Sequence, residues 1–138
     1  MATQVSVHHS ERRAALQRCY AKVLVVDDDA EFRALARHML DTAGFEVAEA
    51  STVSECMAHL RSHTTDVVIL DLVLPDQDGI EALSKIKTLF PEIRVVTVSG
   101  AVSSELYLSV SSYLGADASL DKSRIASLCA LLNVVLDR

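Results

Sequence analysis

Five short segments rich in β-branched residues recur along the 138-residue chain, and a segment with helical periodicity follows each of them. Three are apolar runs without polar alternation, which is typical of strands covered on both faces: 22–26, 66–70 and 94–98. The segments 45–50 and 118–120 mix apolar and polar residues, as expected of half-exposed edge strands. This alternation of strand and helix predicts parallel strands joined by right-handed crossovers.

Helical periodicity predicts five helices, at residues 29–43, 52–63, 80–90, 103–114 and 124–136. The order is therefore (βα)5, an α/β fold with one doubly wound parallel sheet and helices on both of its faces. Because the two polar strands belong at the edges, we expect the strand order 2-1-3-4-5, the flavodoxin-like arrangement. We expect residues 1–21 to form an N-terminal extension, either a frayed tail or a short helix from Ser10 onward, and residues 22–138 to form the domain.

Composition and charge exclude several classes of protein. Apolar runs such as 23–26 are four residues long, whereas a membrane span needs about 20. The three cysteines show no disulfide spacing and the N-terminus has no signal-peptide core, so we expect a cytoplasmic protein with reduced thiols. The net charge of −6 combines +3 over residues 1–22 with −9 over the rest, and there is no Trp. This acidic body argues against direct binding of nucleic acid.

The residues that follow the predicted strands share an ability to bind or transfer charged groups. They are Asp27, Asp28 and Asp29 after the first strand, Asp71 after the third, Ser99 and Gly100 at the end of the fourth, and Asp121 and Lys122 after the fifth. In an open parallel sheet, ligands bind beyond the carboxyl ends of the strands, near the point where the strand order reverses. We therefore expect acids, a hydroxyl and an ammonium group to converge on one rim of the sheet.

Two explanations fit the three consecutive aspartates. In the first, Asp28 is a helix N-cap with Glu31 as its N3 partner. Capping accounts for one or two acids but not for three that face Asp71, because unit charges about 4 Å apart near a protein surface repel by roughly 4 kcal/mol. A bound cation would relieve this repulsion. Oxygen ligands without His or Cys indicate Mg²⁺, with the aspartates at 27–29 and Asp71 as the available carboxylates.

Asp71 is also a candidate nucleophile. As the first residue of a polar loop it has a simpler explanation, a strand-end carboxylate in a turn. Beside a metal, however, a carboxylate can attack a phosphoryl group and form an acyl phosphate. The reaction needs positioning and charge neutralisation, which a metal, the Ser99 hydroxyl and the Lys122 ammonium would supply. Taken singly, Ser99 would be a strand-end hydroxyl and Lys122 a solvated surface lysine; their shared rim favours the functional interpretation.

Residues 22–137 closely resemble the receiver domain of bacterial two-component response regulators. The resemblance rests on four motifs in the family's order: 25–29 (VVDDD), 69–79 (ILDLVLPDQDG), 98–100 (VSG), and 115–117 (GAD) leading to Lys122. It implies that Asp71 is the phosphoacceptor. It also implies that Asp28, Asp71 and the backbone carbonyl of Val73 hold Mg²⁺, while Asp27 contacts the ion through a water molecule.

The same resemblance assigns roles to the remaining rim residues. Ser99 would hydrogen-bond the phosphoryl group and report its presence by moving, Lys122 would pair with a phosphoryl oxygen, and Gly100 would belong to the cofactor-binding part of the site. Two residues depart from the family pattern: Ser123 stands where a Pro is usual, and Ser119 where the family has the aromatic residue of its switch. The segment 99–115 is also one residue longer than is common and rich in serine, so we expect its helix to be labile.

The resemblance implies a phosphorylation-dependent signalling module that takes a phosphoryl group on Asp71 from a histidine kinase or a histidine phosphotransfer protein. Such a module is no ordinary enzyme, although it catalyses its own phosphorylation and slow dephosphorylation. One alternative is the excised receiver of a DNA-binding transcription regulator. Another is a Mg²⁺-dependent phosphatase of the haloacid dehalogenase type, but that family has a second acid where this chain has Val73. A flavin-binding flavodoxin is excluded because three acids replace its phosphate loop.

Apolar residues outside the expected core stripes predict a partner surface on the last two helices. In the helix at 103–114, we expect Leu106, Val110 and Leu114 to face the core and Tyr107 and Leu108 to point outward. In the last helix, Ile125, Leu128, Leu132 and Val135 form the core stripe, which leaves Leu131, Val134 and Leu136 outside it. We expect the face with Tyr107, Leu131 and Val134 to bind a second copy of the chain or an effector.

Overall fold

The structure is a computed structural model that describes residues 21–100 and 104–137, and it confirms the predicted sheet. Its strands are β1 (Lys22–Val26), β2 (Glu46–Ala50), β3 (Val67–Asp71), β4 (Arg94–Ser99) and β5 (Ala118–Asp121). All neighbouring strands pair in parallel, in the order β2-β1-β3-β4-β5. The predicted extension at 1–21 lies outside the described residues except for Ala21, which is buried in the core.

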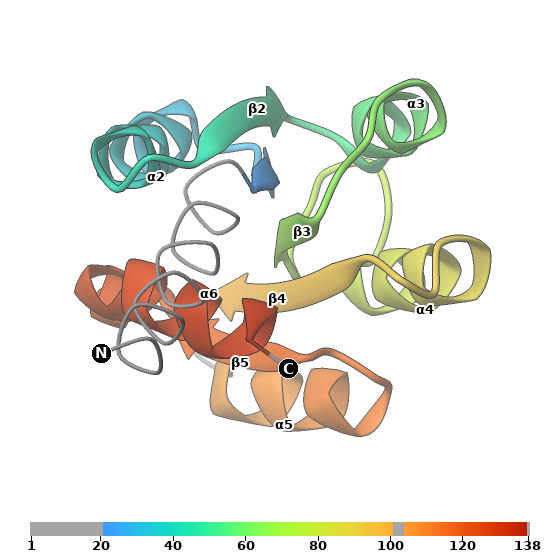
Figure 1. Cartoon of the computed structure of the whole chain (residues 1–138). Helices are drawn as coiled ribbons and strands as arrows, with labels where there is room; N and C mark the ends of the chain where they lie inside the picture. Colours follow the sequence, from blue (N-terminus) through green and yellow to red (C-terminus); the bar gives the residue numbers. More distant parts are fainter. Residues whose placement is uncertain (1–20, 101–103, 138) are drawn as a thin grey trace, which may run out of the picture.

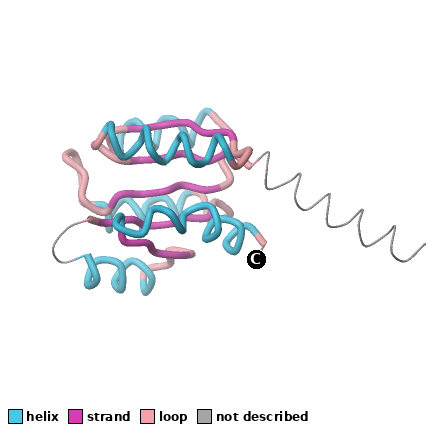
Figure 2. Tube along the Cα trace, turned by 90° about the vertical axis from the view of Figure 1, so that its left-hand side faces the viewer, coloured by secondary structure: helices cyan, strands magenta, loops and turns pink. Residues whose placement is uncertain are grey.

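Helices cover both faces of the sheet, as predicted. They are α2 (Ala30–Thr42), α3 (Val53–Ser62), α4 (Gly79–Leu89), α5 (Ser104–Tyr113), the 3₁₀ helix η1 (Lys122–Ser127) and α6 (Leu128–Leu136). Figure 1 shows α2 and α6 on one face, α3 and α4 on the other, and α5 beside the edge strand β5. The helices run alongside the strands (Figure 2). Because all the strands are parallel, their carboxyl ends share one rim. No helix in the described part of the chain is long and apolar enough to span a membrane.

Two apolar cores explain why the central strands have no polar alternation. Successive side chains of a strand point to opposite faces. Val25 and Ile69 therefore pack beneath α2 and α6, while Leu24 and Leu70 pack beneath α3 and α4, and all four side chains are fully buried. Both faces of β1 and β3 are covered, which fixes the positions of the residues that follow these strands.

The cap of α2 differs from the predicted one. Asp29, not Asp28, is the N-cap, and its carboxylate accepts hydrogen bonds from the backbone N–H groups of Glu31 at 3.0 Å and Phe32 at 3.4 Å. A cap oxygen must reach the second and third N–H groups of the helix, which only the residue directly before Ala30 can do. The cap at Asp29 leaves the exposed Asp28 available for another role.

The last predicted helix, 124–136, is wrong at its start. The α-helix begins only at Leu128, and Arg124 has non-helical backbone angles (φ −106°, ψ 27°) within η1. The turn before it depends on Ser123, whose backbone N–H donates to Asp121 Oδ1 at 2.9 Å. A proline at this position has no N–H to donate. The serine therefore provides a side-chain-capped turn that fixes the backbone directly after Lys122.

The orientation of α5 contradicts the prediction. Leu106, Val110 and Leu114 were expected in the core, but their exposed fractions are 68%, 39% and 41%. Leu108, expected to point outward, is half-buried, and Ser111 is completely buried. The buried hydroxyl bonds to β4 and β5, and this polar contact decides which face of the short helix turns inward. The side chain of Tyr107 lies outside the described part of the structure.

Candidate functional site

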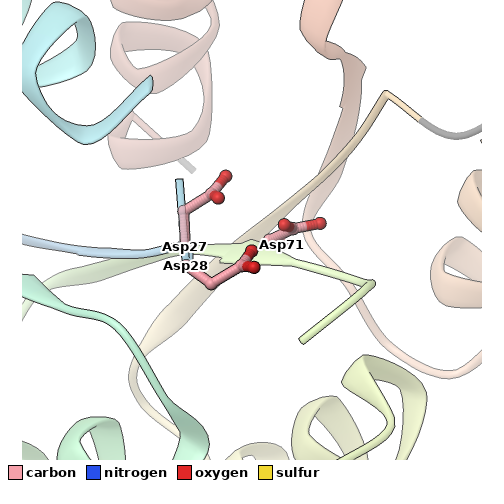
Figure 3. A group of neighbouring side chains, drawn as sticks. All are labelled: Asp27, Asp28 and Asp71. Atoms are coloured by element: carbon pink, nitrogen blue, oxygen red, sulfur yellow. The ribbon is translucent and has the colours of Figure 1, made fainter. Parts of the chain in front are cut away.

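Three aspartates meet where β1 and β3 end. Asp71 is the last residue of β3, and Asp27 and Asp28 directly follow β1. Val26 pairs with Leu70 in the sheet, so the next residue on each strand, Asp27 and Asp71, lies at the same rim. The three side chains each offer an oxygen within 4.8 Å of the others (Figure 3), with Asp27 and Asp71 buried and Asp28 exposed. The predicted cluster is thus assembled from two neighbouring strands.

Lys122 reaches this cluster from the end of β5. Its Nζ lies 2.6 Å from Asp27 Oδ2 and 3.3 Å from Asp71 Oδ2. The contact with Asp27 is an ion pair without hydrogen-bond geometry, because Asp27 Oδ2 is a buried side-chain oxygen that accepts no hydrogen bond from the described residues. Burying a carboxylate oxygen without a hydrogen bond is costly. One ammonium therefore faces two buried carboxylates and the exposed Asp28, a charge balance that fits an additional cation.

The environment of Asp71 changes its protonation. Burial, and to a smaller extent the neighbouring Asp27, raise the pKa of Asp71 to about 6 against the opposing effects of the Val73 N–H and Lys122. Burial alone would lower the pKa of Lys122, but its interactions with the carboxylates of Asp27 and Asp71 outweigh burial and raise it. The pocket therefore combines an ammonium that stays charged with a carboxylate whose negative charge is destabilised.

The loop after β3 is held in one shape around the carboxylates. Asp71 Oδ1 accepts the Val73 N–H at 3.0 Å, and Val73 forms an isolated antiparallel bridge with Asp78. Gly79 donates its N–H to Leu72 O at 3.1 Å, and a Cβ on Gly79 would collide with the Leu72 backbone. Gly79 carried no predicted role, and its signal in the sequence was an Asp-Gly step before a helical segment. A glycine here permits the close approach that holds Val73 beside Asp71.

Ser99 and Gly100 lie on the far side of Asp71 from β1. Asp71 pairs with Val98, so Ser99 is one residue further along the neighbouring strand, where it is fully buried. Gly100 lies against the aliphatic stem of Lys122, and a Cβ on Gly100 would approach Lys122 Cδ to 3.3 Å. The predicted site residues from β1, β3, β4 and β5 thus all lie at one rim of the sheet.

Two residues of α2 contact the site although no sequence pattern indicated a role for either. Arg33 donates from Nη1 to the backbone carbonyl of Asp27 at 2.5 Å and from Nε to Glu49 at 3.0 Å. Lys122 Nζ lies 4.6 Å from the centroid of the Phe32 ring. The contact between Lys122 and Phe32 joins segments that are far apart in the chain, which a local pattern does not reveal.

Ser119, in place of an aromatic residue, belongs to a group that we call the hydroxyl cluster: Thr97, Ser111, Ser112 and Ser119. Thr97 Oγ1 lies 2.7 Å from Ser111 Oγ and 2.9 Å from Ser119 Oγ. Ser119 Oγ also lies 3.2 Å from Ser111 Oγ and 3.1 Å from Ser112 Oγ, and Ser111 donates to Leu108 O at 2.8 Å. The cluster ties α5 to β4 and β5.

The fold and the rim together define a class of protein. It is a flavodoxin-like α/β domain in which an acidic pocket with one lysine lies where the strand order reverses, between β1 and β3. The response regulator receiver domain model matches residues 23–133. The chain belongs to this family, the receiver domains of two-component response regulators, which are phosphoacceptor signalling modules.

Individual relatives agree with this family. The chain is 35% identical to the chemotaxis protein CheY of Bacillus subtilis over 79 residues, which are 56% of this chain and 66% of that protein. It is 32% identical to the C4-dicarboxylate transport transcriptional regulatory protein DctD of Rhizobium meliloti, over 56% of this chain and 17% of that protein. A CheY-like receiver domain from Methanospirillum hungatei JF-1 matches with a TM-score of 0.78 and 32% identity, over 86% of this chain and 94% of that one. These matches thus span less than two thirds of each curated relative's length.

Proposed function

We propose that Asp71 accepts a phosphoryl group from a histidine kinase or a histidine phosphotransfer protein, and that the chain works in the cytoplasm as the switch of a phosphorelay. The observation that carries this proposal is the placement of Asp71: a buried carboxylate at a strand end, beside Asp27 and Asp28, with Lys122 Nζ 3.3 Å from its Oδ2. Family membership supports this class of reaction, and these contacts support Asp71 as the phosphoacceptor.

The acidic residues fit Mg²⁺. The donors are oxygens, and three carboxylates share the single ammonium of Lys122 among the described residues of the site, a charge balance that supports a bound cation. Asp28, Asp71 and the backbone carbonyl of Val73 would hold the ion, with Asp27 beside it. When bound, the ion supplies neutralisation of the negative charge on the phosphoryl oxygens.

The residues of the chain carry out the transfer. An Asp71 oxygen attacks phosphorus, so an O–P bond forms while the P–N bond to the donor histidine breaks, and its electron pair returns to the imidazole nitrogen. With a pKa of about 6, Asp71 is mostly the carboxylate, its nucleophilic form, at pH 7. The Lys122 ammonium neutralises a phosphoryl oxygen and the Ser99 hydroxyl donates to another. Attack of water on the acyl phosphate later releases inorganic phosphate and restores the carboxylate.

The proposed output surface changes with the orientation of α5. Of the residues expected to form it, Val134 of α6 is 54% exposed, Leu131 is half-buried against the core, and the Tyr107 side chain is not described. Exposed apolar residues of α5, together with Leu114 directly after it, take their place: Leu106, Val110, Tyr113 and Leu114. We name these four residues and Val134 the α5–α6 surface. Exposed apolar groups of this kind are typical of protein interaction sites, and we propose that phosphorylation strengthens binding of a second copy or an effector there.

A second candidate is the receiver part of a longer DNA-binding regulator. It is favoured by the match to the transcriptional regulatory protein DctD, because the aligned part is only 17% of the length of that protein. The chemistry at Asp71 is the same in both candidates, so the test below applies to either. A phosphatase of the haloacid dehalogenase type is disfavoured, because Val73 supplies a backbone N–H to Asp71 and no second acid.

Intact-mass spectrometry with phosphoramidate and Mg²⁺ tests the proposal. We expect the wild-type chain to gain the mass of one phosphoryl group, stable in acid and lost in base, and Asp71→Asn to gain none. Asp41→Asn, which changes an exposed aspartate of α2, is the matched control and should label like wild type. Equal labelling of Asp71→Asn and wild type would refute the assignment.

A further inference from the structure

The ammonium of Lys122 has a third neighbour besides the two carboxylates. Nζ lies 4.6 Å from the centroid of the Phe32 ring, within the distance at which a cation is attracted to an aromatic face. Phe32 is 8% exposed and belongs to the core beneath α2 and α6, so its ring is held by packing. The backbone N–H of Phe32 is one of the groups capped by Asp29, which fixes the first turn of α2.

The rest of the Lys122 side chain is guided as well. The hydrogen bond from Ser123 to Asp121 fixes the turn that follows Lys122, and the absence of a side chain on Gly100 leaves room for the lysine stem. The stem thus passes Gly100 and the ammonium ends beside Phe32, where 22% of the lysine side chain remains exposed.

We propose that Phe32 is a positioning residue for phosphoryl transfer, whose ring holds the Lys122 ammonium where it can reach a phosphoryl oxygen on Asp71. This inference rests on the proposed function of Asp71. The choice of an aromatic ring has a physical reason: a third carboxylate would also hold the ammonium, but its charge would repel the incoming phosphoryl group. A ring face attracts the cation through its quadrupole and carries no net charge. An aliphatic side chain would exclude water but would not attract the ammonium.

Nuclear magnetic resonance of the wild-type chain tests the contact directly. The ε-methylene protons of Lys122 lie next to the ammonium and should be shifted upfield by the ring current of Phe32. We expect Phe32→Leu to remove this shift and Phe32→Tyr to keep it. Resonances at the ordinary lysine position in the wild-type chain would overturn the proposal without any variant.

Phosphorylation kinetics test the functional part. With phosphoramidate and saturating Mg²⁺, we expect Phe32→Leu to lower the maximal rate about tenfold, a factor within reach of one desolvated cation–π contact. The donor concentration at half-maximal rate should stay unchanged, because Phe32 acts through Lys122 and does not bind the donor. Phe32→Tyr should restore the rate to within about twofold, since it retains the ring face.

Phe45→Leu is the matched control. Phe45 is 5% exposed, belongs to the same core as Phe32 and lies just beyond the C-terminal end of α2, so this change also removes a buried ring. Its loss of stability should resemble that of Phe32→Leu in thermal unfolding, while its phosphorylation rate should stay within about twofold of wild type. Equal slowing by both variants, or none by Phe32→Leu, would overturn the inference. Absence of labelling in the wild-type chain would instead refute the role of Asp71, and the proton shifts would still decide whether Phe32 holds Lys122.

Discussion

At the scale of single residues, the three consecutive aspartates that follow β1 have identical side chains but different environments. Asp27 is buried against Lys122, Asp28 is exposed, and Asp29 caps α2. All three carry the same carboxylate, so their different surroundings set their tasks. Substitution of each should therefore have a different consequence.

The first prediction concerns Asp28. Asp28→Ala should weaken Mg²⁺ binding at least about tenfold in calorimetric titration, because it removes a directly coordinating anion and leaves Asp71 as the other. Asp29→Ser is the control, since it removes a neighbouring negative charge but keeps a side-chain oxygen for the helix cap. We expect its affinity to change less than about threefold. Equal losses in the two variants would show that only the overall charge matters.

The second prediction concerns the pH dependence of stability. The Arg37 and Arg33 guanidinium groups lower the pKa of Glu49 below its ordinary value of 4.5, despite some burial. A depressed pKa in the folded state contributes stability that is present above the unfolded pKa and is lost as the pH falls through the folded value. Glu49→Gln should therefore lower the free energy of unfolding at pH 7 by roughly 0.5–1 kcal/mol, the usual range for partly exposed ion pairs.

Urea denaturation at several pH values measures this effect. The difference between Glu49→Gln and wild type should shrink as the pH falls below about 5, where the carboxylate of the unfolded chain begins to protonate. Glu92→Gln, at an exposed position between α4 and β4, should show a smaller difference at pH 7. A difference for Glu49→Gln that does not change with pH would contradict the ion-pair explanation.

At the scale of elements, α5 is held by polar contacts. Among its described side chains Ser111 is the buried one, and the hydroxyl cluster links it to β4 and β5, while Leu106, Val110 and Tyr113 remain exposed. The described side chains of α5 bury little apolar area, so we expect its local opening to require little free energy. This makes α5 the element that phosphorylation is expected to reorganise.

The third prediction follows from the hydroxyl cluster. In hydrogen exchange, beryllofluoride with Mg²⁺ should change protection most between residues 100 and 114, and Ser111→Ala should raise the exchange rate of α5 even without it. The variant loses buried hydrogen bonds worth about 1 kcal/mol each. Ser109→Ala, an exposed position on the same helix, should leave exchange unchanged. A response to beryllofluoride confined to α2 and α3 would contradict this route of signalling.

At the scale of the whole molecule, the proposed output depends on an exposed apolar area. Leu106 is 68% and Val134 is 54% exposed, and they lie on the two helices next to β5. Other exposed apolar residues are dispersed over the surface, among them Leu35 on α2 and Leu89 on α4. Only the first pair belongs to the α5–α6 surface, so the two pairs offer a matched comparison.

The fourth prediction compares these pairs by light scattering with beryllofluoride and Mg²⁺. We expect the wild-type chain to form dimers under these conditions, the Leu106→Ser, Val134→Ser variant to stay monomeric, and the Leu35→Ser, Leu89→Ser variant to behave like wild type. Because all four side chains are partly exposed, thermal unfolding should change little in either variant. A wild-type chain that stays monomeric would exclude the homodimer and leave effector binding to be measured by pull-down.

The sequence by itself determined the (βα)5 order, the strand order and the residues at the carboxyl ends of the strands. These features depend on local patterns: continuous apolar runs mark strands covered on both faces, and the residue that follows a strand must lie at its end. For this reason the boundaries of the five strands and the first four predicted helices agree within one residue with those in the structure. The same patterns placed Asp27, Asp28, Asp71, Ser99 and Lys122 at one rim.

Only the tertiary structure decided the orientation of α5 and the neighbours of Lys122, because both depend on contacts between segments that are far apart in the chain. The face of α5 that carries Ser111 points inward because the Ser111 hydroxyl bonds to Thr97 and Ser119 on two other elements. Phe32 reached Lys122, 90 positions away in the chain, because α2 packs over the end of β1. Hydrophobic periodicity records which residues are apolar, but it does not record the partners of a buried hydroxyl or an ammonium group, since those partners are chosen by the packing of the whole fold.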